Sequence, residues 1–510
     1  MFIECIFLII IGIVTSLSLP PFNFFIINFI TFPLFFLFLK NKLKQNKNYK
    51  FFFLYGWLFG FGYFISNLYW ISISLTFDKN FEFLIPFTIF LIPAFLSIFY
   101  GLASSLFSIF KSQNTIISLL FFSLIFGVIE FLRSSVLTGF PWNLIAFSFS
   151  KNLEILSILS ITGTYGFNLL CITFFTSPAI FILRDTKKDL LVFVFSIFTL
   201  IAFYIFGYSY KEKFKNTDYD DFDYKIRIIS SNIGLERFYS NQDPALVISD
   251  LIKISNPNEN EKTIFVWPEG IVPNTLQENI NEFKELFSQN FDENHFLILG
   301  INKQQTENDL VRFFNSLSIY DDKLNLLYSY DKINLVPFGE FLPAENFLKS
   351  IGFKSLANNY QSFSSGDQRN IINFNQKNIT IKILPLICYE IIYSGKLFVS
   401  SDFDIILNIS EDGWFGQSIG PKQHFVHSIF RAIESGKYVV RSANNGLSAI
   451  VNPIGEIEQS VDYGQSGYID FEGHKKIQPT IFSRYGNKIF GLLILLYIFL
   501  IFSFNKIRNE

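Results

Sequence analysis

Three residue types that together can perform acyl transfer lie in the central, polar part of the chain. Cys388 stands in Leu-Ile-Cys-Tyr-Glu, Glu269 in Trp-Pro-Glu-Gly, and Lys332 begins Lys-Ile-Asn-Leu-Val-Pro-Phe-Gly-Glu. A thiol nucleophile needs a base to take its proton and a donor to hold the developing oxyanion. Glu269 could be that base, and Lys332 could supply positive charge to the thiolate and the tetrahedral oxygen. The three residues predict an enzyme that works through a thioester.

Each of these residues alone has a plainer explanation. Cys388 alone would be a buried free cysteine, and Glu269 and Lys332 would be surface charges. Histidine offers no substitute base, because His295 and His474 are isolated in the sequence. The prediction therefore depends on the combination.

The elements around these residues predict an α/β layered unit. The runs that are typical of strands are 225–231, 263–267, 296–301, 316–320, 379–387 and 403–409. Residues 274–289 and 421–436 are predicted to be helices. Alternating strands and helices favour a layered domain, and Glu269 and Cys388 directly follow two of the strands. Residues at neighbouring strand ends converge in space although they are distant in sequence.

A second histidine pattern lies on the predicted helix 421–436. His424 and His427 are three residues apart, which could suggest a metal. Two histidines without a further ligand at a suitable spacing are a weak signal, so polar packing on the helix face is favoured. No metal site is predicted.

Apolar runs long enough to cross a bilayer surround the polar part. A spanning helix needs about 20 residues. The eight candidate spans are residues 2–19, 23–39, 51–74, 83–110, 115–136, 155–183, 189–208 and 487–505. These spans predict a membrane bundle at 1–208, a catalytic unit at 209–486, and a last span with a short tail at 487–510.

Basic residues in the short loops predict the orientation. Positive charge marks cytoplasmic loops. The charges are Lys40, Lys42, Lys44, Lys47 and Lys50 after the second span, Lys111 after the fourth, Arg184, Lys187 and Lys188 after the sixth, and Lys506 and Arg508 after the eighth. The loops after the second, fourth and sixth spans and the tail after the eighth are thus cytoplasmic. This predicts that residues 209–486 face the other side of the membrane.

Two charges fall within the fifth span. Glu130 and Arg133 are three residues apart, so they could pair with each other or face a wet cavity. Trp142 follows in Gly-Phe-Pro-Trp, where a belt tryptophan at the membrane interface is the simpler interpretation.

The composition excludes a nucleic-acid-binding protein and a disulfide-rich protein. The chain has 510 residues with a net charge of −2, so it lacks the basic face that a nucleic-acid partner requires. Its three cysteines are Cys5, Cys171 and Cys388, and the first two lie in apolar segments. A disulfide framework is therefore excluded.

At these motifs the chain resembles the carbon–nitrogen hydrolase (nitrilase) superfamily with its Glu-Lys-Cys triad. Seven spans before such a unit and one after it are similar to the apolipoprotein N-acyltransferase family. The shared motifs extend to Asp-Gly-Trp-Phe-Gly at 412–416 and Arg-Ser-Ala-Asn-Asn-Gly at 441–446. The resemblance covers nearly the whole chain.

The resemblance implies a polytopic α-helical bundle that carries an αββα sandwich, in a bacterial inner membrane with the sandwich facing the periplasm. It implies that Cys388 attacks a phospholipid acyl ester, that Glu269 is the base and that Lys332 stabilises the tetrahedral intermediates. The acyl chain then passes to the α-amine of a diacylglyceryl-modified cysteine on an apolipoprotein. No soluble cofactor is implied. By resemblance, the supporting residues near the triad are Glu340, Tyr389, Glu390 and Trp414.

The chain departs from the family pattern in three places. Glu411 stands where the family usually has Asn, and Ser230-Ser231-Asn232 replaces the usual Gln-Gly/Pro-Asn. The following lid segment often has Lys-Trp, and here it reads Arg237-Phe238-Tyr239. The triad motifs are intact.

Three other functions remain open from the sequence. A membrane-anchored amidase acting on a small amide would share the triad, but it would not need seven preceding spans. A membrane receptor or scaffold that has lost its chemistry would not need the triad. A thiol-reactivity assay would distinguish such a protein from an enzyme. A transporter would be expected to show inverted repeats of broken helices, which the spans lack.

Overall fold

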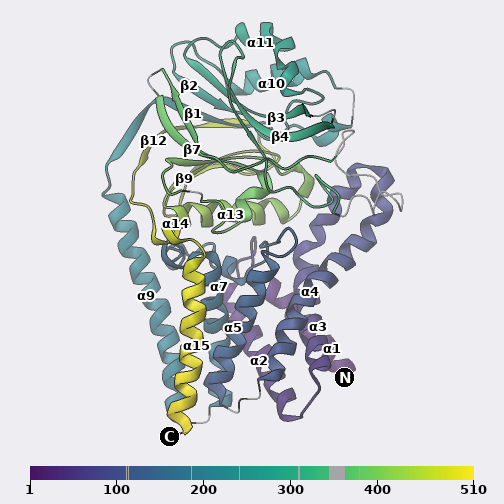
Figure 1. The fold of residues 1–510 in the computed structure, drawn as a ribbon, viewed down its shortest axis with the longest axis vertical. Helices are drawn as coiled ribbons and strands as arrows, with labels where there is room; N and C mark the ends of the chain where they lie inside the picture. Colours follow the sequence, from purple (N-terminus) through teal and green to yellow (C-terminus); the bar gives the residue numbers. More distant parts are fainter. Residues whose placement is uncertain are drawn as a thin grey trace.

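The computed structural model describes residues 1–509 apart from 111, 113, 185, 240–241, 308–309, 344–361, 378 and 399. Helices at both ends of the chain form a bundle, and two stacked sheets lie at one end of it (Figure 1). Both termini lie in the part of the bundle away from the sheets. Lys111, one of the loop charges, is outside the described residues.

Seven apolar helical segments have the length and composition to cross a membrane. They are Phe25–Lys44, Tyr49–Phe77, Lys79–Ile109, Thr115–Arg133, Leu159–Leu183, Leu190–Lys215 and Lys488–Lys506. They contain α2 (Asn28–Lys44), α3 (Tyr49–Leu68), α4 (Ile85–Ile109), α5 (Thr115–Arg133), α7 (Leu159–Thr176), α9 (Leu190–Lys215) and α15 (Lys488–Asn509). Each coincides with a predicted span.

The first predicted span is shorter than expected. The run 2–19 forms α1 (Phe2–Ser16), which has 15 residues and ends in turns before the Pro20-Pro21 pair. At about 1.5 Å per residue it falls short of a full hydrocarbon core. Among the described residues, seven helices rather than eight therefore have spanning length, and α1 instead packs along α3.

Two six-stranded mixed sheets form the α/β unit. One has the order β12-β1-β2-β3-β4-β5 and the other β11-β10-β9-β8-β7-β6. The first sheet contains β1 (Tyr219–Ser230), β2 (Thr263–Val266), β3 (His295–Glu307), β4 (Leu310–Asp321), β5 (Leu326–Asp331) and β12 (Gly467–Lys475). The second contains β6 (Ile372–Gln376), β7 (Ile379–Ile387), β8 (Ile405–Glu411), β9 (Tyr438–Asn444), β10 (Ser448–Val451) and β11 (Ile457–Val461).

Helices cover the outer faces of the two sheets. Helices α10 (Pro244–Ser255) and α11 (Lys284–Ser288) lie on the side away from the bundle, and α13 (Gly420–Ser435) lies between the second sheet and the bundle (Figure 1). Parallel triplets β1-β2-β3 and β7-β8-β9 form the sheet centres. Buried Val, Ile, Leu and Phe fill these strands, as expected when both faces are covered. The predicted α/β sandwich on a membrane bundle is confirmed.

One predicted helix is largely wrong. Residues 274–289 form a 3₁₀ segment over Gln277–Phe283 and only the short α11 after it. Leu276 makes an isolated β-bridge to Asn302, which holds the start of this segment in an extended conformation. This tertiary pairing overrides the helical pattern of the sequence.

The α/β unit is fixed to the bundle through α13. Gln423 accepts hydrogen bonds from the indoles of Trp70 (3.3 Å) and Trp142 (2.8 Å). Glu434 accepts from the backbone N–H and hydroxyl of Thr164, at 2.7 and 2.6 Å. Trp142 is therefore a buried contact to the α/β unit rather than a belt residue.

Candidate active site

The site is built where several central strands end. Glu269 comes three residues after β2, Lys332 directly follows β5, and Cys388 directly follows β7. All three side chains are largely buried. The stacking of the two sheets brings strand ends from both to one place, so residues up to 119 positions apart share one site (Glu269 to Cys388).

Lys332 is held between two carboxylates. Its Nζ donates to Oε1 of Glu269 at 3.0 Å and to Oε1 of Glu340 at 2.8 Å. Burial opposes its charge, but Glu269 and Glu340 outweigh that effect and raise the pKa of Lys332 well above its ordinary value. Lys332 therefore carries a fixed positive charge at any working pH.

Asn315 completes this group. Its Nδ2 donates to Glu269 at 2.7 Å and to Glu340 at 3.0 Å. The backbone N–H of Glu411 donates to the other oxygen of Glu269 at 2.9 Å. With three donors around it, Glu269 is fixed in one orientation. Asn315 was missed from the sequence, where its only signal is a polar residue at the edge of the predicted strand 316–320.

Cys388 stands on a strained turn. Its φ is 48°, in the left-handed region that non-glycine residues seldom adopt. The 3₁₀ segment Cys388–Ile392 then begins at once. Such a turn points a nucleophile away from the sheet, as in other strand-to-helix nucleophile turns.

The thiol is uncharged in the resting site. Burial raises the pKa of Cys388 well above its ordinary value, and the negative charge of Glu269 adds to this effect. Lys332 and a hydrogen bond with Ser410 act in the opposite direction without overcoming it. A base is therefore required at the moment of attack.

Glu390 holds the two loops of the site together. It is fully buried and accepts hydrogen bonds from the Tyr330 hydroxyl (2.9 Å), the N–H of Ile333 (3.0 Å), Arg369 (2.8 Å) and the N–H of Ile387 (2.8 Å). It thus links the strand before Cys388 to the residue after Lys332. Its position indicates a structural role rather than proton transfer.

Two tyrosines fix the cysteine turn to the membrane bundle. The Tyr389 hydroxyl donates to the carbonyl of Gly139 at 3.0 Å, and the Tyr393 hydroxyl donates to the carbonyl of Thr138 at 2.9 Å. Both carbonyls lie in the loop that follows α5. The Cys388 turn therefore rests on the loop that follows a helix of membrane-spanning length.

The charges predicted within the fifth span pair with each other. Arg133 Nε donates to Glu130 at 2.7 Å, and Arg133 also donates to the carbonyl of Phe140. The pair thus braces the loop on which Tyr389 and Tyr393 rest.

Trp414 lies at the edge of an aromatic group. Its ring stacks on Phe238, with centroids 5.7 Å apart, and meets Phe77 edge-on at 5.9 Å. Phe238 comes from the predicted lid, and Phe77 is the last residue of the apolar segment Tyr49–Phe77. The structure therefore joins lid, sandwich and bundle at this point.

The departure from the family pattern at Glu411 has a local explanation. Glu411 pairs with Arg237 of the predicted lid, and accepts from Asn444 at 2.7 Å and from the N–H of Gly413 at 2.8 Å. Burial raises the pKa of Glu411 despite these partners. Glu411 and Arg237 thus form a buried ion pair next to the backbone that holds Glu269.

One group of side chains in the described part of the chain has metal-ligand character. Candidate ligand atoms of Cys388, Asp412 and His424 lie within 4.8 Å of one another. Arg441 already donates to both carboxylate oxygens of Asp412, at 2.8 and 3.0 Å, and His424 Nδ1 lies 2.9 Å from it. Burial would raise the pKa of Asp412, but Arg441 and His424 lower it to about 2. Because Arg441 already neutralises the Asp412 carboxylate, these three side chains do not fit a cation site.

Two family models match the two parts of the chain. Residues 252–474 match the carbon–nitrogen hydrolase family model, and residues 11–176 match the model of the apolipoprotein N-acyltransferase N-terminal domain. A solved structure with some likeness is Saccharomyces cerevisiae Nit3, a nitrilase-superfamily member, at 16% identity over 49% of this chain and 89% of that one, with a TM-score of 0.33.

Full-length relatives define the family. The chain is 33% identical to an apolipoprotein N-acyltransferase of Rickettsia prowazekii, over 98% of each chain. It is 30% identical to one of Rhodopseudomonas palustris, over 96% of this chain and 93% of the relative. The chain belongs to the apolipoprotein N-acyltransferase family.

Proposed function

We propose that this protein transfers an acyl chain from a phospholipid, through a thioester on Cys388, to the N-terminal amine of the diacylglyceryl-cysteine of apolipoproteins. The observation that carries the proposal is the anchoring of the cysteine turn on the bundle through Tyr389 and Tyr393. A reactive turn seated on a membrane helix can meet an ester at the lipid headgroup level. A small-amide hydrolase gains nothing from this position, although it would share the triad.

The first half-reaction forms the thioester. Glu269 takes the proton of Cys388 as the sulfur attacks the carbonyl carbon of the lipid ester. Lys332 stabilises the oxyanion of the tetrahedral intermediate. When the intermediate collapses, the C–O bond breaks, and protonated Glu269 returns its proton to the leaving alkoxide of the lysophospholipid.

The second half-reaction reverses the roles. The acceptor amine attacks the thioester carbon, and Glu269 takes a proton from the nitrogen. The C–S bond breaks, an amide forms, and Glu269 reprotonates the departing sulfur. Glu340 and Asn315 support both steps by holding Lys332 and Glu269 in place.

The location follows from the loop charges. We infer that the protein lies in the inner membrane, with the unit 209–486 on the periplasmic side, because the basic loops gather at the other ends of the spans. Lipoprotein N-termini and phospholipids are both available at that surface.

Mass spectrometry of lipoprotein N-termini tests the activity. Cells that contain the protein are expected to carry an N-acyl group on the lipidated cysteine, and cells that lack it or carry Cys388→Ala are expected to carry a free amine. N-acylation that persists without the protein would contradict the proposal.

A further inference from the structure

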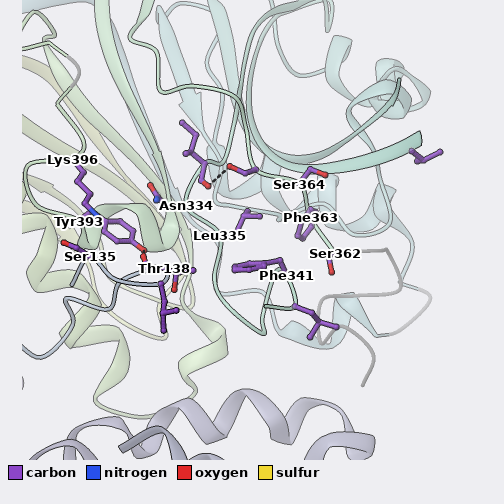
Figure 2. Close-up of a pocket in the computed structure, with 15 residues that line it drawn as sticks. Ser135, Thr138, Asn334, Leu335, Phe341, Ser362, Phe363, Ser364, Tyr393 and Lys396 are labelled. Carbon is purple, nitrogen blue, oxygen red and sulfur yellow. Dashed lines mark hydrogen bonds between the residues drawn. The ribbon is translucent and has the colours of Figure 1, made fainter. Parts of the chain in front are cut away.

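A cavity of about 720 Å³ lies beside the site, on the boundary between bundle and sandwich (Figure 2). Its walls come from the loop after α5, from the residues that follow Lys332, and from the turn that follows the Cys388–Ile392 segment. Cavities of roughly 300–1,000 Å³ are the usual size of small-molecule sites. The triad residues do not line this cavity, but Ile333, directly after Lys332, does, and so does Tyr393, five residues after Cys388.

The cavity has a polar end at Lys396 and a mixed end opposite it. Ser135, Thr138, Tyr393 and Lys396 gather at the polar end, and Leu335, Phe341 and Phe363 lie toward the other beside Ser362 and Ser364 (Figure 2). A ligand with a charged group and a part that is both polar and apolar, such as a glycerol ester, matches this lining.

The polar end contains a cation without a matching anion. Lys396 forms no ion pair with any residue that the structure describes, and its ammonium lies 5.9 Å from the centre of the Tyr393 ring. Lys396 is exposed, and the partial burial of its ammonium still lowers its pKa. An anion bound in the cavity could pair with this ammonium.

A second polar group of the same end is also unpartnered. Ser135 Oγ is shielded from solvent, and it makes no hydrogen bond within the described part of the chain. A buried hydroxyl without a partner is costly unless a ligand or water satisfies it. Ser135 lines the same cavity as Lys396.

We propose that this cavity binds the phosphate of a glycerophospholipid, with the phosphodiester at Lys396 and Ser135 and the glycerol side along Leu335 and Phe341. The proposal rests on the proposed function, since it assigns the site that holds the acyl donor's headgroup. A phosphate oxygen accepts a charge-assisted hydrogen bond from an ammonium. Because Ile333, directly after Lys332, lines the cavity, a headgroup held there keeps its ester close to the triad.

The test measures Cys388 acylation as a function of phospholipid concentration in detergent micelles. The variants are Lys396→Gln, Lys396→Arg and, as a matched control, Lys284→Gln at the start of α11, at the far side of the sandwich (Figure 1). Lys396→Gln is expected to raise KM about 3- to 10-fold, the loss of one partly exposed charged hydrogen bond, with kcat within about twofold. Lys396→Arg and Lys284→Gln are expected to keep KM within about twofold.

Two further arms identify what is recognised. Phosphatidylglycerol and phosphatidylethanolamine share the phosphate, so their KM values are expected to rise equally in Lys396→Gln. Turnover of a small p-nitrophenyl ester, which has no phosphate, is expected to stay unchanged, and this shows that the variant is folded and its triad intact. sn-Glycerol 3-phosphate distinguishes a soluble phosphate ester from a lipid phosphate as the ligand. If it competes with phospholipid in the wild type but not in Lys396→Gln, the site accepts soluble phosphate esters. If Lys396→Gln raises KM but sn-glycerol 3-phosphate does not compete, the site binds the phosphate only as part of a lipid.

An unchanged KM in Lys396→Gln would overturn the phosphate site, and so would a loss confined to phosphatidylglycerol, since Lys396 would then respond to net headgroup charge. Failure of the proposed function looks different. In that case the wild type itself would form no acyl-Cys388 from phospholipid.

Discussion

The division of labour between Glu269 and Lys332 can be tested by the pH dependence of two variants. Glu269→Gln keeps the shape of the side chain but removes the base. It also removes the carboxylate that raises the thiol pKa, and it leaves Lys332, which lowers that pKa, in place. The pKa of Cys388 is therefore expected to fall toward the ordinary cysteine value of about 8.5.

Lys332→Met is expected to change the pKa of Cys388 in the opposite direction. It removes the ammonium 3.0 Å from Glu269 and 2.8 Å from Glu340, so a buried and a partly buried carboxylate are left to share Asn315. The thiol pKa rises further, because the Lys332 charge that lowers it is gone. Loss of one oxyanion donor costs about 10²–10³ in rate, and no change of pH restores that donor.

The expected profiles differ in slope. Glu269→Gln is expected to lose about 10²–10⁴ in kcat at pH 7 and to recover about tenfold per pH unit up to the pKa of the thiol. Lys332→Met is expected to change by less than about threefold between pH 7 and 9, since Glu269 still acts as base. Glu259→Gln, an exposed glutamate remote from the site, is the matched control and is expected to follow the wild type.

The assay is single-turnover acylation of Cys388 by phospholipid between pH 6.5 and 9.5, with thermal unfolding measured for each variant. Equal recovery of both variants at high pH would refute the assignment of Lys332 as oxyanion donor. A flat profile for Glu269→Gln would refute the assignment of Glu269 as base.

Two further predictions concern the orientation and the support of the site. A reporter that is active only in the periplasm is expected to be active when fused within 300–310 and inactive when fused after Lys44, and the reverse result would overturn the orientation and the proposed substrate together. Glu390→Gln is expected to lower the free energy of unfolding by about 3 kcal/mol and to abolish most activity, because it leaves Arg369 buried without its charge partner; denaturation of the purified variant measures this, and wild-type stability would show that Glu390 does not hold the loops.

The placement of Glu269 and Cys388 at neighbouring strand ends could be predicted from the sequence because each lies just after a hydrophobic strand. Glu269 and Cys388 come after the runs 263–267 and 379–387, and the ends of such strands converge in layered α/β folds. The apolar runs likewise predict seven of the spanning helices, because length and hydropathy alone decide whether a helix can cross a bilayer.

Other features depend on contacts between distant residues. Asn315 is identified only by its distances to Glu269 and Glu340, and the Arg237–Glu411 pair joins positions 174 residues apart. Strands β5 and β6 are short and partly exposed, so neither was predicted. Helix α10 begins with Asp243 as its cap and Pro244 in its first turn, a helix-start signal that was missed. The cavity at Lys396 is lined by residues from five separate segments of the chain, which no local pattern reveals.

The identity of the acylated atom tests the central claim most directly. After incubation with phospholipid, peptide mass spectrometry is expected to find the acyl group on Cys388, released by neutral hydroxylamine as a thioester is. Cys388→Ala is expected to abolish labelling, and Cys388→Ser to leave little, because a hydroxyl is a far weaker nucleophile at neutral pH. Labelling that survives in Cys388→Ala, or an acyl group on another residue, would contradict the account.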